Sequence, residues 1–312
     1  MQIVHSLAPV FLIIALGAVL HWRGFLCGAT LAGLSKLTYW VGLPAWLFYR
    51  TSRIDLVRSL SGGLLVMVFF GTVVALVAGG VTARLSRMPT PSRGAYLQAC
   101  FRGNLAYIGI PVMVYAFADL ARPDYEIIQN SAIVAFIPLI IFYNVASVVL
   151  LLKGRQDDGT DPGRSAWRPL LTNPLILACL LGGVFSLLNI PLLLGIERTL
   201  EAVGQIALPS ALLCVGGSLV VSPVRQNLSG AVGASLIKVL VAPLGGWVAA
   251  TALGLDPHLA AAGMILLACP TAAASFVLAE QLRGDVALAS SAILVSTLLS
   301  IGTFSLLLLL FF

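Results

Sequence analysis

The sequence is poor in charge and in histidine, and its five cysteines form no closely spaced pair. Charged residues make up only 10% of the 312 residues, whereas hydrophobic residues make up 59%. This balance excludes a water-soluble globular chain and is typical of a membrane protein, whose first partner is the lipid bilayer. The 18 basic residues are too scattered for a nucleic-acid surface. The three histidines and the separated cysteines predict neither a metal site nor a disulfide, and we find no cofactor motif.

Long apolar runs dominate the chain, separated by charged residues, glycine and proline. A helix needs about 20 apolar residues to cross a hydrocarbon core about 30 Å thick. The first run has no basic leader and no small-residue cleavage site, so we expect a retained span rather than a signal peptide. The runs predict an all-α membrane protein with ten transmembrane helices, at 3–21, 29–50, 60–83, 94–118, 127–152, 170–189, 199–221, 229–253, 258–281 and 286–311.

Loop-forming and charged residues cluster near the middle of the chain. We therefore predict a first five-helix repeat at 1–152, a central cytoplasmic loop at 153–169 and a second repeat at 170–312. If the N-terminus lies outside, the inner connections hold eleven Lys and Arg and the outer ones hold five. Because cytoplasmic loops carry the excess of positive charge, this bias favours both termini outside. The outer cluster of Arg50, Arg53 and Arg58 argues locally against it.

Proline recurs at matching places in the two halves. Pro44 and Pro209 follow a leucine in the second and seventh predicted spans, and Pro111 and Pro270 lie in the fourth and ninth. Because five is odd, a duplicated five-span unit must cross the membrane in the opposite sense. Inverted repeats with matching broken helices are typical of secondary transporters, whose site lies where those helices meet. A simple proline kink in a continuous helix is the alternative at each position.

The fourth predicted span is the most polar, because it contains Arg102, Asn104, Tyr107, Gly109 and Pro111. The Asn104 amide offers donors and acceptors to a substrate or to unwound backbone. Arg102 lies where it could face a site or extend to the membrane surface, and both interpretations stay open.

The eighth predicted span contains Lys238 near mid-membrane, where an unpaired cation costs at least about 2.5 kcal/mol. It needs a backbone carbonyl as a partner, or it takes part in anion binding or proton coupling. No Asp or Glu lies deep in any predicted span. Two buried cations without acids favour an anionic substrate.

The ninth predicted span supplies small residues and hydroxyl groups after Pro270. Thr271 and Ser275 either line a site with this proline or allow close helix packing. No nucleophile, base and acid converge within the spans, so we do not expect an enzyme. The candidate substrate-binding residues are Arg102, Asn104, Tyr107, Gly109, Pro111, Pro270, Thr271 and Ser275, and Lys238 is the candidate for charge balance or coupling.

Two of these motifs resemble the auxin efflux carrier family, which includes plant auxin exporters and bacterial malate or malonate permeases. They are Gly103-Asn104 with Tyr107-Ile108-Gly109-Ile110-Pro111, and Cys269-Pro270-Thr271-Ala272 with Ser275-Phe276-Val277-Leu278-Ala279. The resemblance implies a fold like the bile-acid symporters and sodium/proton antiporters, with helices four and nine crossed. It also implies that spans one, two, six and seven form a scaffold for a mobile core, and that Asn104, Pro111 and Pro270 bind an organic anion.

We therefore expect an elevator-type secondary carrier in the bacterial cytoplasmic membrane. Its substrate would be a small organic anion such as malate or malonate, since the short central connection is similar to that of the bacterial permeases rather than the plant auxin exporters. An anion channel or a solute-binding membrane sensor is the alternative function. A homodimer is compatible with the sequence.

Overall fold

The computed structural model is all-helical over the residues that it describes, which are 2–118, 124–153, 172–221 and 228–311. Helices lie within each of the ten ranges predicted as spans. The predicted central loop lies outside the described residues, except for Lys153 at the end of a helix. The prediction of an all-α protein with several apolar spans is confirmed. Five described helices are long and apolar enough to cross a membrane: Gly62–Leu85, Tyr125–Lys153, Leu194–Val220, Leu228–Ala252 and Val286–Phe311.

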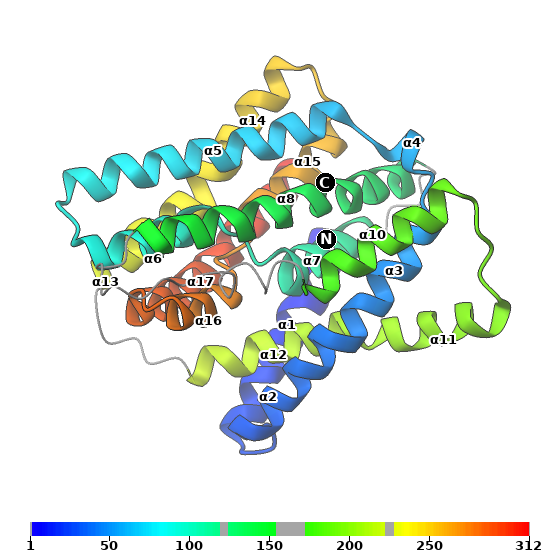
Figure 1. Ribbon diagram of the computed structural model, residues 1–312, viewed down its shortest axis with the longest axis horizontal. Coiled ribbons are helices and arrows are strands. Elements are labelled where there is room, and N and C mark those ends of the chain that lie inside the picture. The colour runs from blue at the N-terminus through cyan, green and yellow to red at the C-terminus, as the bar shows by residue number, and fades with distance from the viewer. Residues whose placement is uncertain (1, 119–123, 154–171, 222–227, 312) are drawn as a thin grey trace. The chain divides into compact units, whose positions relative to one another are not determined.

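The chain forms two compact units, each built from separate stretches of sequence. The first unit comprises Met1–Ser61, Ala106–Ile137 and Thr172–Val221. Within it, α1 packs along α12, and α3 lies beside α10 (Figure 1). Its helices are α1 (Gln2–Trp22), α2 (Gly28–Leu37), α3 (Leu43–Arg53), α4 (Leu56–Ser59), α7 (Ile110–Ala118), the first part of α8 (Asp124–Lys153), α10 (Pro174–Leu187), α11 (Leu194–Gln205) and α12 (Ala207–Val221).

Glycine allows α1 and α12 to approach until their backbones touch. A Cβ atom on Gly216 would lie 1.9 Å from the Ile14 carbonyl oxygen, and one on Gly17 would lie 2.3 Å from the Leu213 carbonyl oxygen. Neither position can hold a side chain without moving a helix. These glycines therefore serve the close packing that small residues provide in membrane helices.

The second unit comprises Gly62–Leu105, Pro138–Leu171 and Ser222–Phe312. Within it, α5 packs along α14 and α13 packs along α17. Predicted spans one, two, six and seven thus fall in the first unit and spans three, eight, nine and ten in the second, while four and five are divided. The helices of the second unit are α5 (Gly62–Leu85), α6 (Thr90–Phe101), the second part of α8, α13 (Leu228–Leu236), α14 (Ala242–Ala252), α15 (Pro257–Ala268), α16 (Ala274–Gln281) and α17 (Val286–Phe311).

Three prolines follow a π-helical turn of five residues. The turns are η1 (Thr38–Gly42), η2 (Leu105–Gly109) and η4 (Ile237–Val241), and each ends two residues before Pro44, Pro111 or Pro243. A proline ring collides with the carbonyl four residues earlier, and the wider π turn relieves that clash while the helix continues. Pro44 therefore lies in a continuous helix, as the kink alternative expects.

The other two prolines of the predicted pattern differ from each other, because Pro209 follows a single turn residue within the apolar helical stretch Leu194–Val220 and only Pro270 stands in a longer gap. Pro209 lies in the first turn of α12, just after Ile206 separates that helix from α11. A first-turn position suits proline because its missing N–H would have no helical partner there. Pro270 lies in the non-helical segment between α15 and α16. The matched prolines thus mark three different local structures, which the sequence pattern alone did not separate.

Candidate functional site

Two interrupted spans meet within the second unit. Helix α6 ends at Phe101, and the fourth span becomes helical again at Leu105. Helix α15 ends at Ala268, and the ninth span becomes helical again at Ala274. Residues 102–104 and 269–273 are therefore two non-helical gaps in otherwise apolar spans, and their backbone polar groups need partners inside the protein.

The two gaps supply partners to each other through the main chain. The pairing satisfies groups that the helices leave open and joins the fourth span to the ninth, and we call this paired region the crossing. Three contacts make this pairing: the Asn104 N–H donates to the Pro270 carbonyl at 2.7 Å, the Ala272 N–H donates to the Arg102 carbonyl at 2.9 Å, and Gly103 pairs with Thr271 in an isolated antiparallel bridge.

Thr271 in the ninth span caps the end of α6, which belongs to the fourth span. Its hydroxyl donates to the Ala99 carbonyl at 2.9 Å, and its own N–H donates to Ser296 Oγ at 2.9 Å. The side chain is fully buried. Because the last carbonyls of a helix have no partner within it, this hydroxyl acts as a cap supplied by another element.

Lys238 holds the end of α15 in a similar way. Its side chain is fully buried on η4, and its ammonium donates to the Leu267 carbonyl in the last turn of α15. A cation is favourable at this negative end of the helix dipole. Gly103 leaves room for the lysine, since a Cβ atom there would lie 3.3 Å from Lys238 Cε. The structure thus contains the carbonyl partner that one interpretation of Lys238 requires; a role in coupling stays a prediction.

Arg102 is buried and held by an amide from another helix. Its guanidinium Nη2 donates to Asn144 Oδ1 at 2.7 Å, and the Asn144 amide donates to the Ile140 carbonyl at 2.8 Å. Only 7% of Arg102 is exposed, and the same fraction holds for Asn104. Arg102 therefore faces the interior of the second unit rather than extending to a surface, which places a fixed positive charge beside the crossing.

Two buried polar residues near Arg102 were not singled out from the sequence. Gln98 on α6 and Ser147 on α8 are both fully buried. Neither polar side-chain atom of Gln98 has a hydrogen-bond partner among the described residues, and the same holds for the hydroxyls of Ser147 and Ser275. A glutamine one helical turn before a buried arginine, in an apolar span, was the available signal.

The remaining candidates lie in the first unit, because the chain passes from the second unit to the first after Leu105. Tyr107 lies in η2, and its hydroxyl donates to the Ser35 carbonyl at 3.2 Å. Gly109 is the last residue of that turn, and Pro111 is the second residue of α7. Six candidates lie in the second unit: Arg102, Asn104, Lys238, Pro270, Thr271 and Ser275.

The chemistry at the crossing is cationic and rich in hydrogen-bond donors. It comprises a guanidinium, an ammonium, side-chain amides, hydroxyls and the peptide groups of the two paired gaps. Among the residues that the structure describes, no group of three or more His, Cys, Asp or Glu side chains could hold a metal ion. Such a donor set suits an anionic solute, because N–H and O–H groups bind carboxylate oxygens with charge-assisted hydrogen bonds.

These helices and their interrupted spans define a multi-pass membrane transport protein. A family model described as "Membrane transport protein" matches residues 2–308, so the chain belongs to this family. It is the auxin efflux carrier family, so the family that the sequence indicated is confirmed. The chain is similar to a protein of Rhizobium meliloti (strain 1021) named "Putative malonate transporter", with 24% identity over 286 residues, which cover 88% of this chain and 85% of the relative.

Proposed function

We propose that this protein is a secondary active carrier that moves a small organic anion across the cytoplasmic membrane. The observation that carries the proposal is the pairing of residues 102–104 with 269–273, where two interrupted helices bring main-chain groups and polar side chains together inside an apolar unit. Interrupted helices of this kind form the substrate sites of secondary transporters. The buried cations Arg102 and Lys238 favour an anion over a cation or a neutral solute.

The substrate that we propose is a carboxylate such as malonate or malate. Carboxylates match the donors of the Arg102 guanidinium and the Asn104 side-chain amide. Thr271, whose own donors bond within the protein, lies in the paired segment beside Gly103. The name of the Rhizobium meliloti relative points to the same class of compound for that protein. We propose that Tyr107, Gly109, Pro111, Pro270 and Ser275 complete the substrate-binding set.

We further propose an elevator-type movement of one compact unit against the other. Support comes from the division of the chain, since spans one, two, six and seven group together as a scaffold would. The interruptions occur at the fourth span of one half and at the fourth span of the other. This correspondence supports inverted repeats at 1–152 and 170–312, and the excess of Lys and Arg in the inner connections supports placing both termini on the outer side of the membrane.

Uptake into proteoliposomes tests the function directly. Purified protein should accumulate labelled malonate or malate, and Asn104→Ala should lower the initial rate by about tenfold or more, because a hydrogen bond to a charged group contributes about 1.5 to 3 kcal/mol. Asn130→Ala, on α8 in the first unit, is the matched control and should leave uptake unchanged.

Three outcomes would contradict the proposal. Undiminished uptake by Asn104→Ala would remove that residue from the site. Single-channel currents in planar bilayers would instead indicate an anion channel. Saturable malonate binding without any uptake would indicate a membrane sensor.

A further inference from the structure

Helices α6 and α8 pack against each other in opposite directions, and two contacts fix their register. A Cβ atom on Gly94 would lie 2.8 Å from the Leu150 carbonyl oxygen. Further along, Arg102 donates to Asn144 at 2.7 Å. Residue numbers increase along α6 from Gly94 to Arg102, while the residues that they contact on α8 decrease in number from Leu150 to Asn144. The seam between these two pairs is therefore two helical turns long.

Gln98 and Ser147 lie in the middle of this seam. Gln98 is four residues from both Gly94 and Arg102, and Ser147 is three residues from both Leu150 and Asn144, so each shares its helix face with the contacts on either side. Both residues are fully buried, and neither has a side-chain hydrogen bond within the described chain. The seam therefore contains the Gln98 amide and the Ser147 hydroxyl, neither of which has a hydrogen-bond partner among the described residues.

The third wall of the seam is α16. This helix begins just after Ala272 pairs with the Arg102 carbonyl, and beyond its end a Cβ atom on Gly284 would lie 2.9 Å from Leu151 Cδ2. It therefore runs back along α6 toward the same end of the seam. Ser275 lies in its first turn, is 1% exposed, and has an unpartnered hydroxyl. No side chain caps the N-terminus of α16 at Ala273.

The charged and polar groups around the seam determine whether an anion or a cation binds there. Arg102 contributes a cation, and the N-terminus of α16 contributes the positive end of a helix dipole. The parts of α6 and α8 that form the seam, 94–102 and 144–151, contain no acidic residue, and Glu280 on α16 is exposed. Asp285, just beyond, accepts a hydrogen bond from Ser92 at 2.7 Å. Donors without a facing carboxylate favour an anion over a cation.

We propose that Gln98, Ser147 and Ser275, together with Arg102, form a pocket for one carboxylate group of a dicarboxylate substrate. This proposal rests on the proposed function, and it adds a binding place for the second carboxylate group, which the crossing alone does not specify. One carboxylate binds at the Asn104 side-chain amide, and the second enters the seam beside Arg102. Buried polar groups are nearly always hydrogen-bonded, so a carboxylate there satisfies donors that the protein leaves open. The pocket therefore selects dicarboxylates over monocarboxylates.

Competition binding with labelled malonate measures this selectivity. Malonate and propionate are compared as competitors on purified protein in detergent, for the wild type and for Gln98→Leu and Ser147→Ala. We expect Gln98→Leu to weaken malonate binding about tenfold, the loss of one charge-assisted hydrogen bond, while propionate binding changes less than about twofold. Ser147→Ala should act in the same direction with a smaller effect. Ser300→Ala is the control, since this buried hydroxyl on α17 already donates to the Thr297 carbonyl at 2.8 Å.

The outcomes separate this proposal from the proposed function. If the wild type binds malonate and propionate, and the variants weaken both equally or neither, the seam contains only water and the pocket is disproved while the carrier function stands. If the wild type binds no carboxylate, the proposed function fails as well. Gln98→Glu gives a second measurement if Gln98→Leu does not fold: its added negative charge should weaken malonate binding more than propionate binding, and equal binding would overturn the pocket.

Discussion

Each compact unit contains a π-helical turn that ends two residues before a proline. A polar side chain on that turn donates a hydrogen bond to a span that is divided between two helices. In the first unit, the hydroxyl of Thr38 on η1 donates to Ser210 Oγ at 2.9 Å, near the start of α12. In the second unit, the ammonium of Lys238 on η4 donates to the Leu267 carbonyl at the end of α15. Both side chains are buried, yet one contact is neutral and the other uses a full charge.

The size of the interruption explains the difference. Only Ile206 separates α11 from α12, and Ser210 itself donates to the Ile206 carbonyl at 2.6 Å. Neutral local hydrogen bonds are enough there. The gap between α15 and α16 spans 269–273, so several carbonyls at the end of α15 lose their helical partners. A cation offsets the resulting negative end more strongly than a hydroxyl can. Charge is thus found where the backbone is most open.

The largest effect is expected from Lys238→Met. Methionine keeps most of the length and apolar character of lysine but leaves the Leu267 carbonyl unsatisfied, which costs about 1 to 3 kcal/mol. The midpoint of thermal unfolding in detergent should fall, and malonate uptake should fall by at least about tenfold because the crossing loses positive potential. Lys36→Met, on an exposed face of α2, is the matched control and should change neither quantity. Unchanged stability and uptake for Lys238→Met would show that the charge of Lys238 does not account for the difference between the two units.

A smaller effect is expected from Thr271→Val in the same unit. Valine keeps the shape of threonine but loses the hydroxyl that donates to the Ala99 carbonyl, which is worth about 1 kcal/mol. Thr251→Val on α14 is the control, because that hydroxyl is exposed and bonds only within its own helix. Equal unfolding midpoints for the two variants would show that the α6 end needs no cap from the ninth span.

Thr38→Val tests the neutral contact of the first unit. The expected loss is about 0.5 kcal/mol, at the low end for a hydrogen bond, because Ser210 keeps the Ile206 and Ala207 carbonyls as acceptors. The unfolding midpoint of Thr38→Val should therefore lie above that of Lys238→Met. The reverse order would mean that the shorter interruption depends more on its partner than the longer one does.

Apolar run length and proline position predicted much of this arrangement from the sequence. The ranges of the helices follow from hydrophobicity over about 20 residues, which is a local property. The need of Lys238 for a carbonyl follows from the inability of hydrocarbon to satisfy polar groups. Proline position predicted the gap at Pro270, but it wrongly placed the break of the fourth span at Pro111, which lies inside α7, seven residues beyond the gap at 102–104. The unpartnered state of Gln98 and Ser147 could not be predicted, because it depends on the register between two helices. The division of the fourth and fifth spans between units is likewise a property of tertiary packing.

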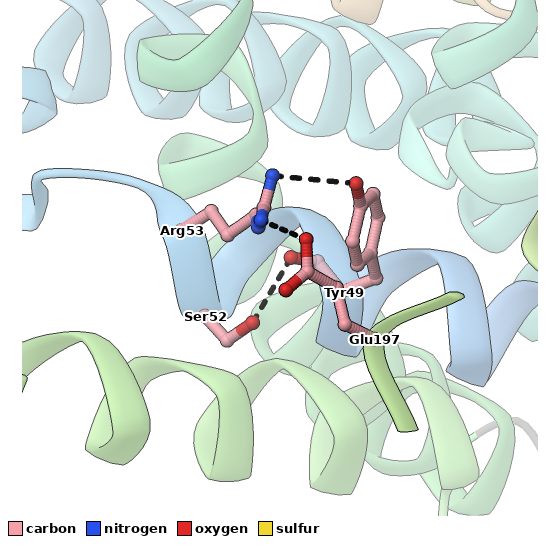
Figure 2. A network of polar contacts seen from close by, with 4 residues as sticks. All are labelled: Tyr49, Ser52, Arg53 and Glu197. Atoms are coloured by element: carbon pink, nitrogen blue, oxygen red, sulfur yellow. Dashed lines mark hydrogen bonds and ion pairs between the residues drawn. The ribbon is translucent and has the colours of Figure 1, made fainter. Parts of the chain in front are cut away.

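The smallest effect is expected at the end of α3, where Figure 2 shows Arg53 in contact with both Tyr49 and Glu197. Arg53 forms an ion pair with Glu197 and lies 5.1 Å from the Tyr49 ring centroid. Its side chain is 54% exposed, so Arg53→Gln should cost less than about 1 kcal/mol. Because the screening length falls to about 3 Å at 1 M salt, even this loss should vanish there. The loss in Lys238→Met should persist at 1 M salt, since salt does not enter a fully buried contact. Equal salt sensitivity in the two variants would show that the Lys238 ammonium is reached by solvent.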